Sequence, residues 1–301
     1  MNCISRIVVF DLDETMGYFT ELGIFWDSLT NYIKNNNINI PKDQNLFNKI
    51  LDLYPEFLRP NILGILNYLK KKKEMNHCDK LMIYTNNQGP KEWAKYIKNY
   101  FETKLDFNIF DQIIAAFKVQ GQQIELCRTT HMKTHKDLIK CTKIPQDTYI
   151  CFLDDVFYPG MSNHKIYYIN IKPYVYDLTF DEMINRFQKS GIITTDPTQC
   201  REQILADMGK YNYTYVDKSE EAQNIDKILS KQIIKHLHVF FDNIKIGKSD
   251  DKQNNAVIKA NTVIKTNTEI KAKKITDDKP NKFTKNKKVF KNKTLKKKKY
   301  N

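Results

Sequence analysis

The segment Arg6-Ile-Val-Val-Phe-Asp-Leu-Asp-Glu-Thr15 decides the fold of this 301-residue chain. Its apolar residues 7–10 stop abruptly at Asp11, and an apolar run of this length that ends in a carboxylate is typical of a buried parallel strand. Three further runs have the same character, at residues 80–84, 148–153 and 165–171. We therefore predict four strands of one buried sheet, the first of them at residues 6–10.

Helical patterns lie between the predicted strands. Apolar residues fall on one helical face after Pro60, and they do so again after Pro90. Strands that alternate with helices predict an α/β fold, a doubly wound parallel sheet with helices on both faces. Sheets of this kind bind their ligands at the carboxyl ends of the strands.

Two further regions accompany this predicted core. Residues 17–58 form an insertion after the first strand and contain eight aromatic residues. The insertion is either a substrate-selecting element above the ligand-binding edge or a small satellite core with no ligand role. A capping box at Thr179–Glu182 predicts a helix, and Asp196-Pro197 starts another within residues 191–244. Residues 191–244 are therefore predicted to be a helical C-terminal extension.

The formal net charge of +14 comes from one end of the chain. Residues 245–301 contain 19 lysines, no arginine and five acidic residues, so residues 1–244 are formally neutral. This distribution excludes a uniformly basic protein that coats nucleic acid. Residues 245–301 have too few apolar side chains to form a core, and we predict a disordered, lysine-rich tail. The tail is either solvated and without a partner, or an arm that binds nucleic acid or directs the protein to the nucleus.

The cysteine pattern and the absence of a leader indicate a compartment. The six cysteines are scattered without a C-x-x-C pair, no apolar leader is present, and no run approaches 18 apolar residues. We therefore expect an intracellular protein, nuclear or cytoplasmic and not secreted, with no membrane partner and without a disulfide framework. No G-x-G-x-x-G is present, which argues against a glycine-dependent nucleotide fold.

Carboxylates follow two of the predicted strands at the point where each strand ends. Asp11 and Asp13 follow the first strand, and Asp154 and Asp155 follow the third. Carboxylates from two strands that meet at one sheet edge repel each other unless a cation neutralises them. Because Mg²⁺ prefers oxygen ligands, these four aspartates predict a Mg²⁺ site.

Groups suited to binding phosphate occur at the second strand and before the third. Thr85 and Asn86 directly follow residues 80–84, and Lys136 lies on a predicted helix, with Lys133 as the alternative lysine. Thr85 is also placed to cap the helix that follows it. Hydroxyl, amide and ammonium groups stabilise the charge on a transferring phosphoryl group. One carboxylate can attack phosphorus while a second moves protons, so the set predicts phosphoryl-transfer chemistry.

The order of these motifs resembles that of the haloacid-dehalogenase-like hydrolases. Four elements carry the resemblance: Asp11-Leu-Asp-Glu-Thr15 after a strand, Thr85, Lys136, and Leu153-Asp-Asp155 after a later strand. The Asp-x-Asp-Glu-Thr form and Arg59-Pro60 are similar to the small phosphatases that act on the RNA polymerase II C-terminal domain, also called nuclear LIM interactor-interacting factor-like phosphatases. The likeness covers roughly residues 4–190, and we expect a phosphatase domain at residues 1–190.

The resemblance implies a role for each of these residues. Asp11 would be the nucleophile, and Asp13 the general acid and base, with its backbone carbonyl on the metal. Phosphate would be held by Thr85, Asn86 and Lys136. Asp154 and Asp155 would complete the Mg²⁺ site, with Asp155 the more direct ligand.

We therefore expect a Mg²⁺-dependent phosphomonoester hydrolase that works through an aspartyl-phosphate intermediate. The resemblance favours phosphoserine or phosphothreonine in a protein or peptide as the substrate. Two alternatives stay open. One is a polynucleotide-end or nucleotide phosphatase tethered by the lysine-rich tail, and the other is a non-catalytic scaffold or nucleic-acid-binding protein that uses this tail.

Overall fold

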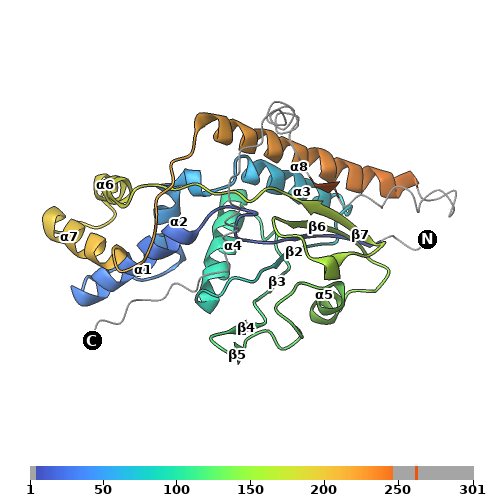
Figure 1. The fold of residues 1–301 in the computed structure, drawn as a ribbon, viewed down its shortest axis with the longest axis horizontal. Coiled ribbons are helices and arrows are strands. Elements are labelled where there is room, and N and C mark those ends of the chain that lie inside the picture. Colours follow the sequence, from blue (N-terminus) through green and yellow to red (C-terminus); the bar gives the residue numbers. More distant parts are fainter. Residues whose placement is uncertain (1–4, 247–261, 264–301) are drawn as a thin grey trace, which may run out of the picture.

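The main sheet is parallel and belongs to an α/β fold, as predicted. The computed structural model describes residues 5–246 and 262–263 (Figure 1). The strands of this sheet are β1 (Arg6–Phe10), β2 (Lys80–Tyr84), β3 (Gln112–Ile114), β6 (Tyr149–Asp154), β7 (Ile166–Asn170) and β8 (Thr262–Val263). Their order is β3-β2-β1-β6-β7-β8. The order runs away from β1 in both directions, which makes the carboxyl end of β1 a topological switch point.

The apolar runs predicted the long strands better than the short ones. β1 and β2 have their predicted bounds, whereas β6 and β7 differ from prediction by a residue at their ends. β3 was not predicted, nor was the small hairpin of β4 (Lys118–Val119) and β5 (Gln122–Gln123). These strands have two or three residues each, too few to show an apolar period.

The strand register brings the carboxyl ends of the central strands level. Phe10 of β1 pairs with Ile83 of β2 and with Leu153 of β6. The backbone N–H of Asp11 donates to the carbonyl oxygen of Leu153 at 2.8 Å. One residue beyond these pairs, Asp11 and Asp154 therefore lie side by side at the same edge.

Helices cover both faces of the sheet. The α-helices of the described residues are α1 (Thr20–Asn35), α2 (Gln44–Asp52), α3 (Ile62–Glu74), α4 (Lys91–Leu105), α5 (His135–Thr142), α6 (Phe180–Ser190), α7 (Pro197–Met208) and α8 (Glu220–Ile246). Val8 and Phe10 point into the larger core, which also contains buried residues of α3, α4 and α8. Ile7 and Val9 point to the opposite face, where Leu138 of α5 completes a smaller core. This alternation is the reason that β1 is apolar on both faces.

The insertion, residues 17–58, forms α1, α2 and a 3-10 turn at Pro55–Phe57. Seven of its eight aromatic side chains are buried within the larger core of the sheet. Phe47 illustrates this, because its ring packs edge-to-face against Trp26 of α1 and Trp93 of α4, with centroids 5.3 and 5.5 Å away. The insertion is therefore an extension of the main core, not a separate satellite, and these buried rings do not form a ligand-facing surface.

The region predicted as a helical extension, residues 191–244, contains α7 and α8. Their predecessor α6 begins as predicted, because Thr179 Oγ1 accepts a hydrogen bond from the Glu182 N–H. α7 is capped in the same way by Asp196. α7 packs against α1 and α6, and α8 lies alongside α3 and β7, where it covers one face of the sheet (Figure 1). Buried side chains of both helices belong to the larger core.

The predicted disordered tail, residues 245–301, lies outside the described residues except at two places. Lys245 and Ile246 end α8, and Thr262–Val263 pair in parallel with β7. Within the described part of the chain, every helix is too short or too polar to cross a membrane.

Candidate functional site

Three carboxylates meet at the carboxyl ends of β1 and β6. We call Asp11, Asp154 and Asp155 the acidic triad, because one ligand oxygen of each lies within 4.8 Å of the others. Asp11 is 8% exposed and Asp154 is fully buried. An all-oxygen donor set of this kind suits a hard divalent cation. The acidic triad could therefore hold a metal ion, and it joins three of the four predicted metal ligands.

Lys133 is the lysine of this site. Its Nζ lies 2.5 Å from Asp11 Oδ1 and 2.7 Å from Asp154 Oδ2, and its side chain is 1% exposed. The prediction of Lys136 is wrong in this respect, because Lys136 lies on α5 with its side chain exposed. The helix begins only at His135, capped by Thr134, so Lys133 precedes it and reaches the carboxylates.

The electrostatics of the site favour a bound cation. When all three carboxylates of the acidic triad are ionised, they outnumber the single ammonium group of Lys133, and the cluster carries an excess of negative charge. Burial, aided by the charge of Asp11, raises the pKa of Asp155 to about 6. Burial also raises the pKa of Asp154 well above its usual value, against the opposing effect of Lys133. Burial alone would lower the pKa of Lys133, but Asp11 and Asp154 outweigh it and raise that pKa.

Asp13 lies three residues beyond the end of β1 and is held by Asn87, which had no role of its own in the sequence prediction. Asn87 Nδ2 donates to Asp13 Oδ2 at 2.8 Å, which ties the turn after β2 to the Asp11–Thr15 loop. Burial and the charge of Asp11 raise the pKa of Asp13 to about 7, although the bond from Asn87 opposes this. Near neutral pH, Asp13 therefore exists in both protonated and ionised forms and can give or take a proton.

The residues predicted to bind phosphate, Thr85 and Asn86, begin the turn after β2. Thr85 is buried, and its Oγ1 accepts a hydrogen bond from the Asn87 N–H at 2.9 Å. It does not cap the following helix, because α4 begins at Lys91. Asn86 Nδ2 donates to the Tyr158 hydroxyl at 2.9 Å. Thr85 thus shapes the turn that presents Asn87 to Asp13.

Thr15, the last residue of the opening motif, supports Asp155. Its hydroxyl donates to Asp155 Oδ1 at 3.1 Å and accepts a hydrogen bond from the Asp155 N–H at 3.2 Å. Thr15 itself is 1% exposed. The pair connects the loop after β1 to the loop after β6, so the motif threonine fixes the orientation of one carboxylate of the acidic triad.

Arg59 holds the backbone of the Asp11–Thr15 loop by hydrogen bonds to its carbonyl oxygens. Its Nε donates to the Thr15 carbonyl at 2.6 Å, and its Nη2 donates to the carbonyls of Glu14 and Lys172 at 2.6 and 2.9 Å. Burial lowers the pKa of Arg59 to about 10. Glu14 has a φ of +54°, a left-handed conformation that a glutamate adopts only when neighbours hold it. Arg59 and the Tyr174 N–H, which also donates to the Glu14 carbonyl, provide that hold.

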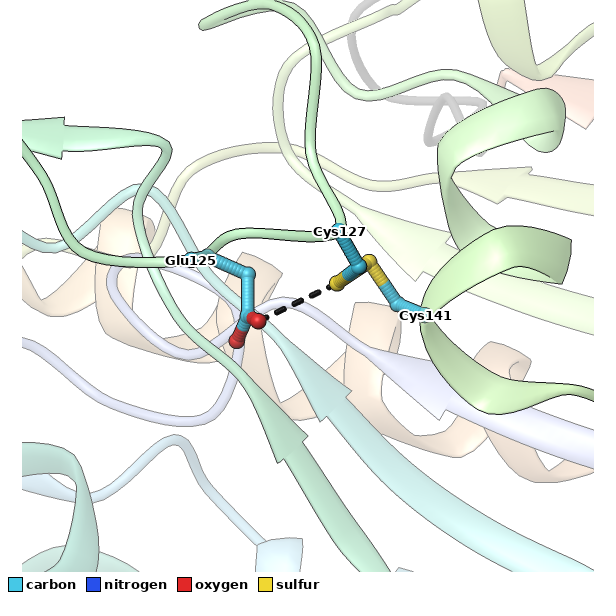
Figure 2. A group of neighbouring side chains, drawn as sticks. All are labelled: Glu125, Cys127 and Cys141. Carbon is cyan, nitrogen blue, oxygen red and sulfur yellow. Dashed lines mark hydrogen bonds between the residues drawn. A yellow bond between two sulfur atoms is a disulfide. The ribbon is translucent and has the colours of Figure 1, made fainter.

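A second group of ligand-type side chains joins α5 to the segment that precedes it: Cys141 lies on α5, and Glu125 and Cys127 face it (Figure 2). Cys127 and Cys141 form a disulfide, so the expectation of reduced, unpaired cysteines is wrong for these two. Their sulfurs, joined to each other, are not available as metal ligands. The other cysteines of the described residues, Cys78, Cys151 and Cys200, are free and buried.

The sequence matches no protein-family model and no curated protein. The assignment of a function therefore depends on the geometry of the site, together with the resemblance of its motifs.

Proposed function

We propose that this chain is a Mg²⁺-dependent phosphomonoester hydrolase of the haloacid-dehalogenase-like type, with Asp11 as its nucleophile. One observation carries the proposal: Lys133 bridges Asp11 and Asp154 at a sheet edge where Asp155 completes the acidic triad. Asp13, held by Asn87, adds a second carboxylate two residues beyond the nucleophile. A nucleophile, a proton carrier and a cation are the groups that phosphoryl transfer through an enzyme carboxylate requires.

In the first step, the Asp11 carboxylate attacks phosphorus and the ester P–O bond breaks. Asp13 in its protonated form gives its proton to the leaving oxygen, which departs as an alcohol. Lys133 stays beside Asp11 and stabilises the negative charge that spreads over the phosphoryl oxygens. The product of this step is an acyl phosphate on Asp11.

In the second step, Asp13 takes a proton from a water molecule as that water attacks the phosphorus of phospho-Asp11. Inorganic phosphate leaves, and the Asp11 carboxylate is regenerated with Asp13 protonated again. Mg²⁺ held by the acidic triad and the Asp13 carbonyl would neutralise phosphoryl charge in both steps.

The proposed substrate class is phosphoserine or phosphothreonine in a protein or peptide. This choice is supported by the resemblance of Asp11–Thr15 and Arg59-Pro60 to the phosphatases of the RNA polymerase II C-terminal domain. The aromatic rings buried in the insertion do not favour a stacked nucleobase, because a base would need exposed rings on which to stack.

The decisive experiment compares wild type with Asp11→Asn on p-nitrophenyl phosphate in the presence of Mg²⁺. We expect the variant to lose turnover by at least about a thousandfold, since the nucleophile is gone. Asp147→Asn, in an exposed loop before β6, is the matched control and should retain full activity. Acid-quenched wild-type enzyme should carry one phosphate on Asp11. Equal rates in wild type and Asp11→Asn would refute the proposal.

A substrate panel then tests the narrower assignment. Phosphoserine and phosphothreonine peptides should be hydrolysed faster than 3′- or 5′-phosphorylated oligonucleotides at equal concentration. The reverse order would move the assignment to a polynucleotide-end phosphatase while leaving the Asp11 mechanism intact.

A further inference from the structure

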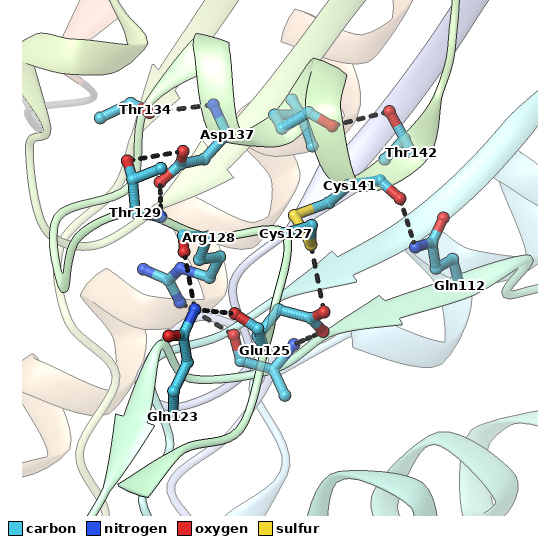
Figure 3. Close-up of a disulfide and its surroundings, with 12 residues drawn as sticks. Gln112, Gln123, Glu125, Cys127, Arg128, Thr129, Thr134, Asp137, Cys141 and Thr142 are labelled. Atoms are coloured by element: carbon cyan, nitrogen blue, oxygen red, sulfur yellow. Dashed lines mark hydrogen bonds between the residues drawn. A yellow bond between two sulfur atoms is a disulfide. The ribbon is translucent and has the colours of Figure 1, made fainter. Parts of the chain in front are cut away.

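We propose that the Cys127–Cys141 pair is a reversible thiol–disulfide modification site that sets how firmly the Lys133 loop is held. We call residues 127–134 the Lys133 loop. The inference deepens the proposed function, since it concerns regulation of the same site, and it rests on Lys133 acting there. Its basis is the position of the disulfide in the chain and in space (Figure 3).

The disulfide closes a covalent loop of residues 127–141, and this loop contains Lys133. Cys127 begins the Lys133 loop and Cys141 lies near the end of α5, with Lys133 between them in sequence. A cross-link of this kind limits how far the enclosed segment can open. Both cysteines are half-buried, whereas the three free cysteines are buried. A dissolved thiol can therefore reach the S–S bond of this pair, whereas the free cysteines are enclosed in the core.

Arg128 connects the disulfide to the phosphate side of the site. It directly follows Cys127, and its guanidinium is almost fully buried. Nη1 donates to the carbonyls of Thr85 and Ala115 at 3.1 and 2.9 Å, and Nη2 donates to the His131 carbonyl at 3.1 Å. The disulfide thus anchors the neighbour of Arg128, and Arg128 is hydrogen-bonded both to the turn after β2 and to His131, two residues before Lys133.

A second tie would remain after the disulfide is broken. The Thr129 N–H and hydroxyl donate to the Asp137 carboxylate at 3.0 and 2.9 Å, and Asp137 is fully buried (Figure 3). This pair joins the Lys133 loop to the first turn of α5. Reduction should therefore loosen the loop without unfolding it, which is the behaviour of an adjustable site.

Glu125 is placed to accept a hydrogen bond from the thiol that reduction creates at Cys127. Its Oε1 lies 3.1 Å from Cys127 Sγ, and its other oxygen, Oε2, accepts from the Ala115 N–H at 3.3 Å. In the disulfide, Cys127 has no proton to donate, so the sulfur–oxygen contact is only a close approach. In the dithiol, the Cys127 thiol can donate to Glu125 across the same gap. The Cys127 sulfur therefore has a partner in both redox states, Cys141 in the disulfide and Glu125 in the dithiol, as a reversible site requires.

The reaction is an ordinary exchange with a dithiol reductant. A thiolate of the reductant attacks one sulfur of the pair, the S–S bond breaks, and the departing sulfur takes up a proton. The second thiol of the reductant then releases the other cysteine. In balance, the protein disulfide gains two electrons and two protons, and the reductant leaves as a disulfide. Disulfides in reducing compartments are mostly transient or redox-sensing, and accessible pairs are the labile ones.

The test uses the full chain in two redox states, with Mg²⁺ present. All proteins carry Cys3→Ser, because Cys3 lies outside the described residues. One sample is oxidised with glutathione disulfide and the other is reduced with dithiothreitol, and the pair is identified by mass after alkylation. Hydrogen exchange of the Lys133 loop should quicken on reduction by on the order of tenfold, with α8 unchanged. For p-nitrophenyl phosphate, kcat/KM should fall severalfold on reduction.

Cysteine variants separate this effect from general sensitivity to thiols. Cys127→Ser and Cys141→Ser should each behave like the reduced protein in both buffers. Cys200→Ser, at a free and buried cysteine of α7, should keep the full response. The proposal is overturned if the pair stays reduced in glutathione disulfide, or if loop exchange is the same in both states. Should both states lack turnover, the phosphatase assignment fails, but the exchange measurement still decides the redox proposal.

Discussion

Lys133 Nζ lies 2.7 Å from Asp154 Oδ2, and this contact joins the segment before α5 to the last residue of β6. The same ammonium group contacts Asp11 at the end of β1. A single buried cation therefore offsets the repulsion between two carboxylates from neighbouring strands. The contact also provides a discriminating test, because a second lysine lies three residues away.

Replacing Lys133 should abolish most of the activity, whereas replacing Lys136 should not. Lys133→Met removes the ammonium group from Asp11 and from the phosphoryl site, and we expect kcat/KM to fall by at least about a hundredfold. Lys136→Met changes an exposed side chain of α5 and should leave kcat/KM within about twofold. Both are measured on p-nitrophenyl phosphate, with circular dichroism to confirm folding. A greater loss in Lys136→Met than in Lys133→Met would contradict the assignment.

Asn87 should act as a positioning residue for Asp13. Asn87→Ala removes the hydrogen bond to Asp13 Oδ2, and we expect kcat to fall about tenfold with a smaller change in KM. Asn87→Asp keeps the size of the side chain but places a carboxylate against Asp13, so it should be worse than alanine. Asn48→Ala, on α2, is the control. If Asn87→Ala raised KM alone, the residue would bind substrate and would not position Asp13.

Arg59 should contribute strongly to stability. Arg59→Met leaves the carbonyls of Glu14, Thr15 and Lys172 without this donor, and the expected loss is on the order of 3 kcal/mol in the free energy of unfolding. Urea unfolding with a fitted m value measures it. Arg201→Met, which breaks an ion pair with Asp181 at the surface, should cost less than about 1 kcal/mol. Similar losses of unfolding free energy in both variants would show that the buried hydrogen bonds of Arg59 stabilise the protein no more than a surface ion pair does.

Mg²⁺ should stabilise the folded protein through the acidic triad. A ligand present at about 100 times its Kd adds about 2.7 kcal/mol to the free energy of unfolding, which is easily seen as a rise in Tm. Asp155→Ala should lose most of this rise, whereas the exposed-loop control Asp147→Asn should keep it. EDTA should reverse the shift. An equal rise in wild type and Asp155→Ala would place the Mg²⁺ elsewhere on the protein.

Glu21 should make stability fall as pH rises. Its side chain is fully buried, Oε2 accepts from the Leu178 N–H at 2.8 Å, and burial raises its pKa from 4.5 to about 8. Between these two pH values the folded state keeps a proton that the unfolded state has released, so the free energy of unfolding decreases with pH. The loss is complete above the folded pKa.

Glu21→Gln isolates this contribution. The amide cannot ionise, so the variant should gain on the order of 3 kcal/mol over wild type between pH 5 and pH 8, read from urea unfolding. Glu74→Gln, at an exposed position near the end of α3, should parallel wild type. A wild-type-minus-Glu21→Gln difference that stays constant with pH would mean that Glu21 is ionised in the folded state.

The sequence predicted strand bounds best for strands that are buried on both faces of the sheet. The strands β1 and β2 could be delimited to the residue, because a run such as Ile7–Phe10 is apolar on both faces and ends in a polar residue. β3 could not be recognised, since three residues show no period and its pairing with β2 depends on tertiary contact. The carboxylate site could be predicted for the same reason as β1: strand ends in a parallel sheet meet at one edge.

The choice of lysine failed because the start of α5 was not located. Thr134 and Asp137 are spaced as a helix cap and first-turn acid, and the Asp137 N–H does donate to Thr134 Oγ1. This signal places Lys133 before the helix and Lys136 on it. The disulfide had no comparable signal, because Cys127 and Cys141 meet only after the loop and α5 have folded back.

The packing of α8 fixes the order in which the molecule can be completed during synthesis. Phe240 of α8 lies in the larger core with its ring centroid 6.1 Å from that of Tyr167 on β7. A nascent chain that has reached only residue 190 already contains the central strands β1, β2 and β6 and the acidic triad, yet the part of the sheet face that α8 covers, next to β7, is still open to solvent. Until α8 leaves the ribosome, that face is a target for chaperones and for self-association.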